Sequence, residues 1–297
     1  MLRFLLPIVL QVSDPASTLG EAPLAPITAE PETCDGTLMQ GGLIICKGAP
    51  GTRFSLGDTT LTADQTGAVA FGLGRKIDGP VRIDASGPGS AMTSFQLPIA
   101  QRLDETSVLN GINCDKIDAR TPEQKARAGE SWVKKQAAWA TFETGRGALD
   151  GFIRPANGRL SSPFGYTRKY VTEGCPVRER PHEGYDIAAP VGSPIVAPAA
   201  GTVILSDDDL YYEGGTVFLD HGHGLVSIFL HMSRVDAQLG DQLQAGDPIG
   251  KIGATGRVTG PHLHWAVKWR DTSREDRDRD FYIDPALLLN LPSTEAD

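Results

Sequence analysis

Long apolar runs are absent from this chain of 297 residues. The N-terminal apolar stretch, Phe4 to Val12, follows Arg3 and is interrupted by Pro7. A membrane-spanning helix needs about 20 apolar residues, so we expect no stable membrane span. A positive residue before a short apolar core is typical of a secretory signal, and a poorly ordered terminus is the alternative. Residues 1–32 are therefore predicted to be a signal peptide and a proline-rich linker.

An excess of basic residues is also absent. The chain has 28 Lys and Arg against 37 Asp and Glu, which gives a formal charge of −9. Nucleic acids and anionic membranes attract positive surfaces, so we predict no nucleic-acid partner. The hydrophobic fraction of 40% excludes wholesale disorder. The 34 glycines and 21 prolines favour turns and short strands over a helical bundle.

Cysteine is scarce, and no CxxC motif is present, which argues against a thiolate metal site. Four cysteines allow three pairings, among which the sequence does not choose. Cys34 and Cys46 flank a segment that is long enough for a hairpin, which leaves Cys114 and Cys175 as a second possible pair. Unpaired buried thiols are the alternative. We favour two disulfides and an oxidising compartment.

The fold is predicted to be mainly β. Residues 33–100 alternate apolar and polar side chains around glycine-rich turns and contain no histidine, so we expect a small antiparallel β-sandwich domain. Residues 151–291 also have short strands separated by Gly/Pro turns, and residues 292–297 are expected to be a tail. The charged stretch 273–280 is expected to be a solvated loop.

One helix is predicted, over residues 121–144, within a loop-and-connector region that spans 101–150. Thr121 can cap this helix, and Gln124 can reach back to form a capping box. Three aromatic residues share one side at helical spacing, which is more often packing than a ligand platform; they are Trp132, Trp139 and Phe142.

All six histidines lie between positions 182 and 264, where uniform scatter would place about two. His262 and His264 are two apart in an apolar strand, so they project from one face. His182 and Asp186 are four apart, which requires a bend that Gly184 can supply. Two imidazoles and one carboxylate leave a fourth tetrahedral position for water, as in a catalytic zinc site.

The pair His182-Glu183 does not begin an HExxH motif, because position 186 is Asp and Pro181 and Gly184 disfavour a helix. We therefore expect Glu183 to be an exposed loop residue.

Three segments, RPHEGYDIAAPVGSPIVAP, DHGHGLVSIFLHMS and GATGRVTGPHLHW, resemble successive signature segments of the lysostaphin/LytM-type zinc peptidases, peptidase family M23. GRLSSPFGYTR resembles the initial strand of that family, and the match covers about 155–290. The upstream sandwich and helix resemble those of Gram-negative murein endopeptidases. The resemblance implies that 151–291 is an antiparallel β-sandwich-like catalytic domain.

By that similarity, Zn²⁺ is held by His182, Asp186 and His264, and His231 and His262 handle protons and stabilise the oxyanion. Which of these two plays which part stays open. His221 is expected to be structural, at a position that the family also tends to fill with histidine, and His223 to be an exposed turn residue.

The sequence departs from the family pattern near the site. Phe229 stands where a phenol is common, and Met232 where Leu is usual. No tyrosine aligns as a further oxyanion donor, the nearby candidates being Tyr166, Tyr170 and Tyr185. Because of these departures, catalytic activity could be lower than is usual for the family, but we expect the metal site to form.

The resemblance implies a periplasmic or secreted zinc metalloendopeptidase that hydrolyses peptide cross-links of peptidoglycan with a metal-activated water. In Gram-negative relatives the target is usually the bond between D-Ala and diaminopimelate. The alternative is a catalytically silent LytM-type activator of cell-wall amidases, but such proteins have lost ligands that are all present here. No GxSxG motif supports a serine mechanism.

Residues 104–118 precede this domain, and in relatives such segments often cover the groove. An oxygen ligand from this loop would occlude the site, and the candidates are Asp104, Asn110 and Asp115. A simple spacer is the alternative.

Overall fold

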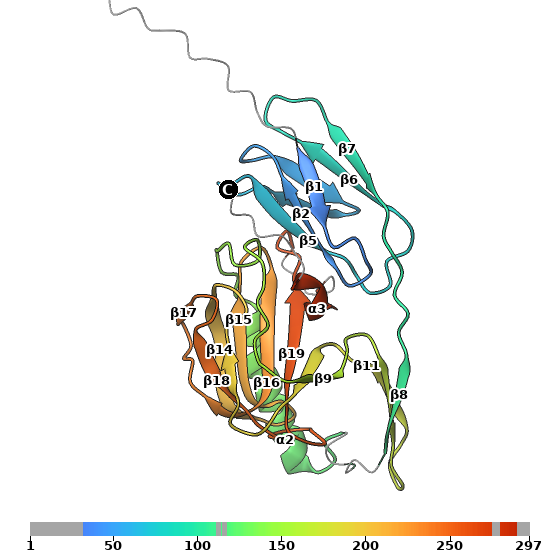
Figure 1. Cartoon of the computed structure of the whole chain (residues 1–297), viewed down its shortest axis with the longest axis vertical. Coiled ribbons are helices and arrows are strands. Elements are labelled where there is room, and N and C mark those ends of the chain that lie inside the picture. The colour runs from blue at the N-terminus through green and yellow to red at the C-terminus, as the bar shows by residue number, and fades with distance from the viewer. Residues whose placement is uncertain (1–31, 111–113, 115–117, 275–279, 290–297) are drawn as a thin grey trace, which may run out of the picture.

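The computed structural model describes residues 32–110, 114, 118–274 and 280–289. The described chain is mostly antiparallel β-sheet, as predicted, and forms an N-terminal and a C-terminal body stacked along the long axis (Figure 1). The predicted signal peptide, and most of the charged 273–280 stretch, lie outside the described residues. None of the described helices is both long and apolar enough to span a bilayer.

The N-terminal body consists of two small sheets, in the orders β1-β2-β5 and β4-β3-β6-β7. The strands are β1 (Thr33–Gly36), β2 (Leu43–Lys47), β3 (Arg53–Leu56), β4 (Thr59–Thr62), β5 (Ala68–Gly72), β6 (Val81–Ser86) and β7 (Thr93–Leu97). Their apolar side chains bury Phe54, Phe71 and Ile83 completely. A disulfide joins Cys34 to Cys46, which are register partners in β1 and β2.

Strand β5 departs from the expected alternation, because all five of its residues are buried. Its second face lies against the C-terminal body, where the Trp269 indole nitrogen donates to the carbonyl of Ala70 at 3.0 Å. A side chain at Gly72 would come within 2.8 Å of that tryptophan. One apolar core therefore runs through both bodies, and the division into domains stays a prediction.

The C-terminal body is built on a ten-stranded sheet with the main order β17-β14-β15-β16-β19-β12-β9, to which β13, β18 and β20 also belong. The strands are β9 (Arg159–Ser162), β12 (Tyr185–Ala188), β13 (Pro194–Val196), β14 (Gly201–Leu210), β15 (Gly214–Asp220), β16 (Leu225–Val235), β17 (Gln242–Leu243), β18 (Pro248–Ile252), β19 (His262–Trp269) and β20 (Phe281–Ile283). A short helix, α3 (Pro285–Leu288), follows. Strand β19 lies between β12 and β16, so its side chains meet residues from both neighbours.

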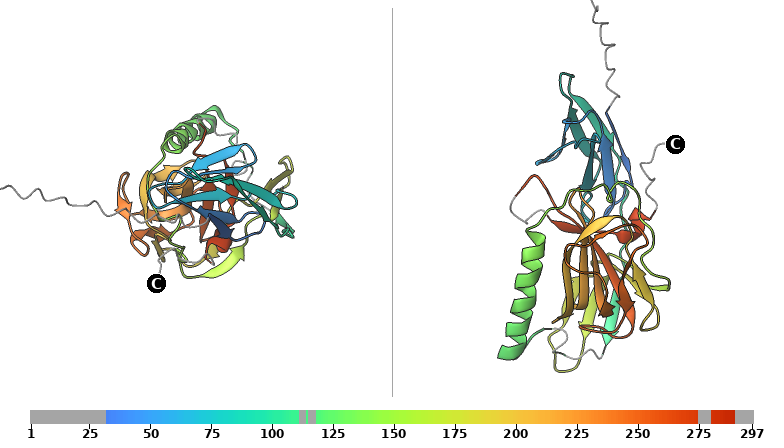
Figure 2. Two further views of the ribbon diagram at one scale, coloured as in Figure 1. Left: turned by 90° about the horizontal axis from the view of Figure 1, so that it is seen from above. Right: turned by 90° about the vertical axis from the view of Figure 1, so that its left-hand side faces the viewer.

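Helix α2 (Pro122–Trp139) runs along one side of the C-terminal body (Figure 2). The predicted capping box is confirmed, since Thr121 Oγ1 accepts from the Gln124 amide at 3.2 Å and the Gln124 side chain accepts from the Thr121 amide at 3.1 Å. The helix ends five residues earlier than predicted, at Trp139, and the amide of the following residue, Ala140, caps the last turn.

The prediction of one packed aromatic stripe on this helix was wrong. Trp139 is buried and stacks on Phe218 with ring centroids 4.5 Å apart, but Trp132 is 59% exposed and Phe142 lies beyond the helix. The helix meets β14 through ion pairs, Lys134 with Asp207 and Arg127 with Asp209, and the Trp132 indole stays largely in solvent.

A fourth sheet lies beside the main sheet of the C-terminal body. We call it the flanking sheet; its strands are β8 (Thr106–Asn110), β10 (Thr167–Val171) and β11 (Arg178–Pro181), in the order β11-β10-β8. Strand β8, which descends from the N-terminal body, pairs with β10 in parallel. A second disulfide, between Cys114 and Cys175, ties the segment after β8 to the β10–β11 loop. Both favoured disulfides are thus present.

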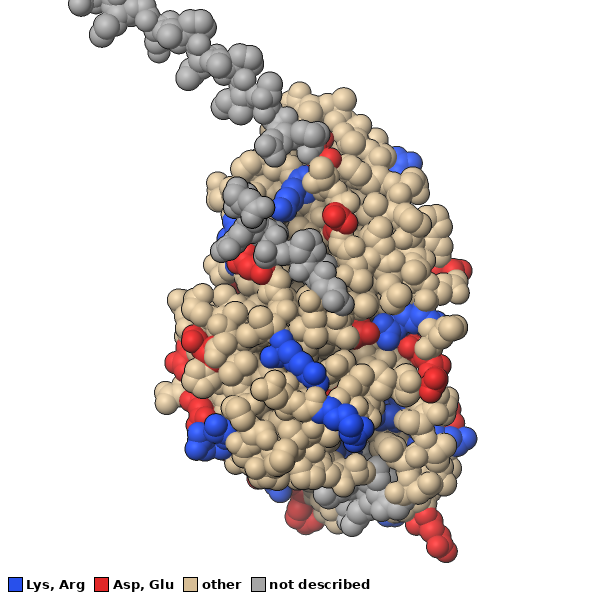
Figure 3. Space-filling model, viewed as in Figure 1, with Lys and Arg blue, Asp and Glu red and all other residues tan. Residues whose placement is uncertain are grey.

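The charges are unevenly distributed over the face seen in Figure 3. Lys and Arg side chains cross the middle of the C-terminal body, while Asp and Glu lie mainly toward its edges.

Candidate active site

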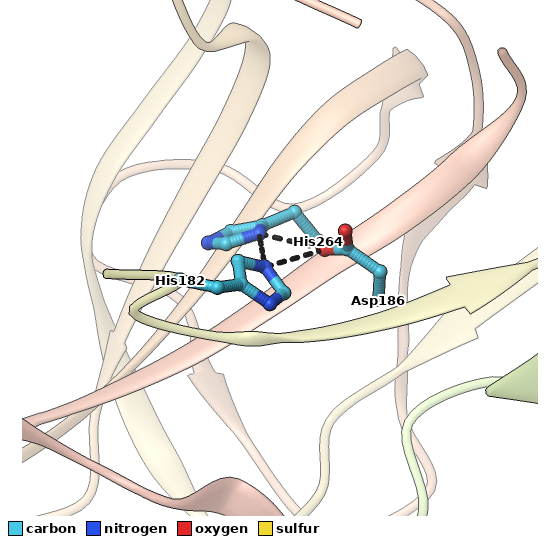
Figure 4. A group of neighbouring side chains, drawn as sticks. All are labelled: His182, Asp186 and His264. Atoms are coloured by element: carbon cyan, nitrogen blue, oxygen red, sulfur yellow. Dashed lines mark hydrogen bonds and ion pairs between the residues drawn. The ribbon is translucent and has the colours of Figure 1, made fainter. Parts of the chain in front are cut away.

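The three predicted metal ligands converge on one point (Figure 4). Antiparallel pairing of β12 with β19 places Asp186 opposite His264. His182 Nε2 lies 3.0 Å from Asp186 Oδ1 and 3.1 Å from His264 Nδ1, and the latter two atoms are 2.8 Å apart. Donors about 2.1 Å from one tetrahedral ion are about 3.4 Å from each other, so this cluster has close to the right size for zinc.

Glycine at position 184 makes the convergence possible. It forms the bend between β11 and β12 that returns His182 to Asp186, as predicted. A Cβ at this position would lie 2.5 Å from Cε1 of His264. Any side chain would therefore displace a predicted ligand.

Hydrogen bonds outside the cluster orient two of the ligands. His182 Nδ1 lies 2.7 Å from the carbonyl of Pro163, so it carries the proton and leaves Nε2 free to face Asp186 and His264. Asp186 directs Oδ1 to the two histidines, and Arg168 donates to its Oδ2. The donor set is thus fixed before any cation binds.

The protonation states suit metal binding. Burial raises the pKa of Asp186, but its close contacts with His182 and His264 outweigh that effect and hold this pKa well below its usual value. Burial lowers the pKa of His264 to about 4, so this imidazole is neutral at neutral pH. An ionised carboxylate and a neutral imidazole are the forms that bind a divalent metal.

His231 and His262 stand beside the three ligands as a pair. Their ring centroids are 5.0 Å apart, and the His231 ring is 6.0 Å from that of His264. Each Nδ1 faces a carbonyl, Thr255 for His231 at 3.0 Å and Gly260 for His262 at 2.9 Å. Each Nε2 therefore lacks a proton in the neutral ring and can act as a base.

The backbone and the burial of His231 are both unusual. Its φ of 68° lies in the left-handed region, which non-glycine residues rarely adopt. Such strain is concentrated at functional sites. Burial lowers its pKa well below the usual value, and the neighbouring His264 and His262 add to that effect, so the ring is neutral. The structure thus brings together all five residues that the sequence singled out.

The histidine pair opens into a cavity of about 280 Å³ between the flanking sheet and residues 257–259. Tyr166 and Tyr170 line this cavity, whereas Tyr185 packs edge-on against Trp265. Arg168 and Arg257 also line it, and sequence reasoning did not single them out. Both lie inside the motif segments. Their contacts are with residues distant in sequence, Asp186 for Arg168 and Tyr212 for Arg257, so no local residue spacing could identify them.

Glu183 is exposed in the loop before β12, as predicted. Asp104 does not occlude the site, because its carboxylate is held by Arg75 at 2.8 Å and Arg102 at 3.2 Å. Asn110 is exposed at the end of β8, and Asp115 lies outside the described residues.

The remaining histidines lie outside the cluster. His221 is completely buried; its Nδ1 donates to the Ala200 carbonyl at 2.7 Å and its Nε2 accepts from Ser227 Oγ at 2.8 Å. His223 is not the exposed turn residue that was predicted. Its side chain is 11% exposed and pairs with Asp64 at 3.3 Å, because the turn packs against the N-terminal body.

We expect the buried His221 to make the protein sensitive to acid. Burial lowers its pKa to about 4 from 6.5, so the unfolded state binds the proton more tightly. The contribution of neutral His221 to the free energy of unfolding is fully present above pH 6.5. It falls as the pH drops toward 4, and the loss over that interval is about 3 kcal/mol. Urea unfolding of the wild type and of His221→Gln at pH 7 and pH 4 measures this loss. Parallel losses in the two proteins would contradict the assignment to His221.

Residues 180–276 match the sequence profile of peptidase family M23. Among curated proteins, the peptidoglycan DD-endopeptidase ShyA of Vibrio cholerae is 38% identical over 111 residues, which are 37% of this chain and 24% of ShyA. A Haemophilus influenzae protein named as an uncharacterized metalloprotease is 34% identical over 145 residues, 46% of this chain and 29% of that protein. The chain thus spans less than a third of either relative.

One solved structure is similar over most of the chain. A Pseudomonas aeruginosa protein assigned to peptidase M23 aligns with a TM-score of 0.60 and 29% sequence identity. The alignment covers 85% of this chain and 95% of that protein. The likeness therefore extends beyond the matched family segment to both bodies.

Proposed function

Because the chain carries a domain of peptidase family M23, we propose that it is a zinc-dependent endopeptidase that hydrolyses peptide cross-links of peptidoglycan. The observation that carries the proposal is the convergence of His182, Asp186 and His264 within about 3 Å. Relatives named as peptidoglycan DD-endopeptidases support the substrate class.

The donor set fits zinc better than a harder cation. Two imidazoles with one carboxylate are ligands that zinc prefers, whereas Mg²⁺ and Ca²⁺ take mainly oxygen. When bound, zinc lowers the pKa of a coordinated water to about 7 and polarises a carbonyl. The rest of the chemistry belongs to the chain: Asp186, His182 and His264 would hold the ion beside the cavity that His231 and His262 line.

The imidazoles of His231 and His262 can meet the proton requirements of peptide hydrolysis. The unprotonated Nε2 of His231 or His262 can take a proton from the attacking water, and the imidazolium so formed can stabilise a developing oxyanion or protonate the leaving amine. Their Nδ1 contacts with Thr255 and Gly260 hold each ring in the tautomer that this requires. His231 and His262 together supply the base and the acid, and the assignment of one role to each stays open.

We also propose that the protein acts in the periplasm or outside the cell. Peptidoglycan lies outside the cytoplasm, and the two disulfides are consistent with an oxidising compartment.

Digestion of purified cross-linked muropeptide dimers by the zinc-loaded full chain tests the proposal. We expect monomers to be released, with a new amine and a new carboxylate at the cut bond. Bound zinc with no release from dimers or from whole sacculi would favour the silent amidase activator instead. The complete set of ligands and both neighbouring histidines argue against that alternative.

Arg257 is expected to recognise a carboxylate of the substrate. In a cross-link between D-Ala and diaminopimelate, the scissile nitrogen is attached to a carbon that bears a free carboxylate. Arg257 lines the cavities on both sides of His231, with its guanidinium 5.0 Å from the Tyr212 ring centroid and its amide donating to the Tyr212 carbonyl at 2.7 Å. A charge-assisted hydrogen bond contributes about 1.5–3 kcal/mol, so Arg257→Gln should raise KM about 10-fold or more with kcat little changed.

The matched control is the same substrate with that carboxylate converted to an amide. Wild type and Arg257→Gln should have the same KM for it. An equal loss on both substrates would show that Arg257 does not recognise the carboxylate.

A further inference from the structure

The two carboxylate oxygens of Asp186 have different partners. Oδ1 lies 3.0 Å from His182 Nε2 and 2.8 Å from His264 Nδ1. Oδ2 accepts from Nη2 of Arg168 and lies 3.8 Å from His262 Nε2. The Asp186 side chain is 6% exposed and that of Arg168 is 19% exposed, so water competes little for this ion pair. Oδ1 is thus available to a cation, whereas Oδ2 is held by Arg168.

Arg168 belongs to the flanking sheet rather than to the main sheet. It is the second residue of β10, the central strand of that sheet, and lies opposite Ser107 of β8 and Arg180 of β11. The predicted ligands come from β12, from β19 and from the bend before β12. The Arg168–Asp186 ion pair therefore connects the two sheets at the site.

The flanking sheet is fixed in place by a segment that lies far from the site in sequence. Asp118 pairs with Arg178 at 3.0 Å and Arg180 at 3.1 Å, so it fastens β11 to the chain that follows β8. The disulfide from Cys114 to Cys175 closes the same connection. All of these contacts lie at or before residue 180, where the match to peptidase family M23 begins.

We propose that Arg168 is a positioning residue that holds Asp186 as a one-oxygen metal ligand, so that the flanking sheet sets the metal affinity of the site. The inference rests on the proposed zinc function. Without the guanidinium, the carboxylate is free to rotate about χ2 or to turn toward His262. Groups that orient metal ligands in this way typically change metal affinity about 10–100-fold.

A positioning role and a purely electrostatic role of Arg168 predict opposite changes in zinc affinity when this residue is replaced. A positive guanidinium repels a cation, so a purely electrostatic role predicts tighter zinc binding in Arg168→Gln. A positioning role predicts weaker binding, with partial recovery in Arg168→Lys, which keeps a donor but loses the planar fork. The sign of the change in Kd separates the two.

Competition with a chromophoric chelator at neutral pH, on the metal-free full chain, measures the zinc Kd. We expect Arg168→Gln to weaken binding about 10–100-fold and Arg168→Lys to weaken it less. Arg159→Gln is the matched control, because Arg159 lies on β9 and its guanidinium donates to the carbonyl of Leu160. The Cys114→Ser/Cys175→Ser variant, with a loosened flanking sheet, should weaken binding by a smaller factor.

Unchanged or tighter binding in Arg168→Gln would overturn the inference. If that variant does not fold, Arg168→Lys and the disulfide variant decide, and wild-type affinity in both would overturn it. In another outcome, the variants shift the zinc Kd as expected while the wild type cuts no peptide. That result would sustain the inference although the proposed function failed. A wild type that binds no zinc would overturn both.

Discussion

Replacing His264 by alanine is expected to abolish zinc binding and to lower kcat/KM by 10⁴-fold or more. His264 Nδ1 contacts both other predicted ligands, at 2.8 Å from Asp186 Oδ1 and 3.1 Å from His182 Nε2. Two remaining ligands do not complete a catalytic zinc site. Without the metal, the pKa of the attacking water rises from about 7 to far above neutral, which removes most of the nucleophile at neutral pH.

Metal analysis of the purified protein and muropeptide digestion measure the two parts of this result. His223→Ala is a suitable control, because His223 lies in the same body but pairs with Asp64 at the contact between the bodies. It should bind one zinc per chain and release peptide like the wild type. A His264→Ala protein that keeps stoichiometric zinc and activity would exclude His264 as a ligand.

Removing one histidine of the neighbouring pair should have a different signature. His262→Ala is expected to lower kcat by about 10²–10⁴-fold while zinc stays bound. The His262 Nδ1 is fixed by the Gly260 carbonyl, and its ring lies 5.0 Å from that of His231, so we expect it to act on protons rather than on the metal. For His231, asparagine is the better substitution, because Asn tolerates the left-handed φ of 68°.

The double variant strengthens this test. Groups that share one proton-transfer step are strongly non-additive, so His262→Ala with His231→Asn should be little worse than the more damaging single variant. Multiplicative losses would mean that the two residues act independently. Loss of zinc from either single variant would place that residue among the ligands instead.

Local sequence patterns, together with the resemblance to family M23, were sufficient to single out the three residues that the fold brings together as a candidate metal site. The two-residue spacing of His262 and His264 and the bend at Gly184 are short-range features, and strand periodicity translates them directly into geometry. The same holds for the capping box at Thr121.

Contacts between distant segments could not be read in this way. Arg168 reaches Asp186 from β10, a strand of a different sheet, and His223 is covered by the N-terminal body, where it pairs with Asp64. Strand β5 was expected to have one solvent face, but Trp269 covers it from nearly 200 residues away. Each of these differences arises from packing that depends on the whole fold.

Anomalous diffraction at the zinc edge, on crystals grown with zinc, tests the central claim most directly. The account predicts one peak per chain, about 2.0–2.2 Å from His182 Nε2, Asp186 Oδ1 and His264 Nδ1. The Asp186 Oδ2 atom should still accept from Arg168. A peak at any other group of residues, or no peak among these three atoms, would contradict it.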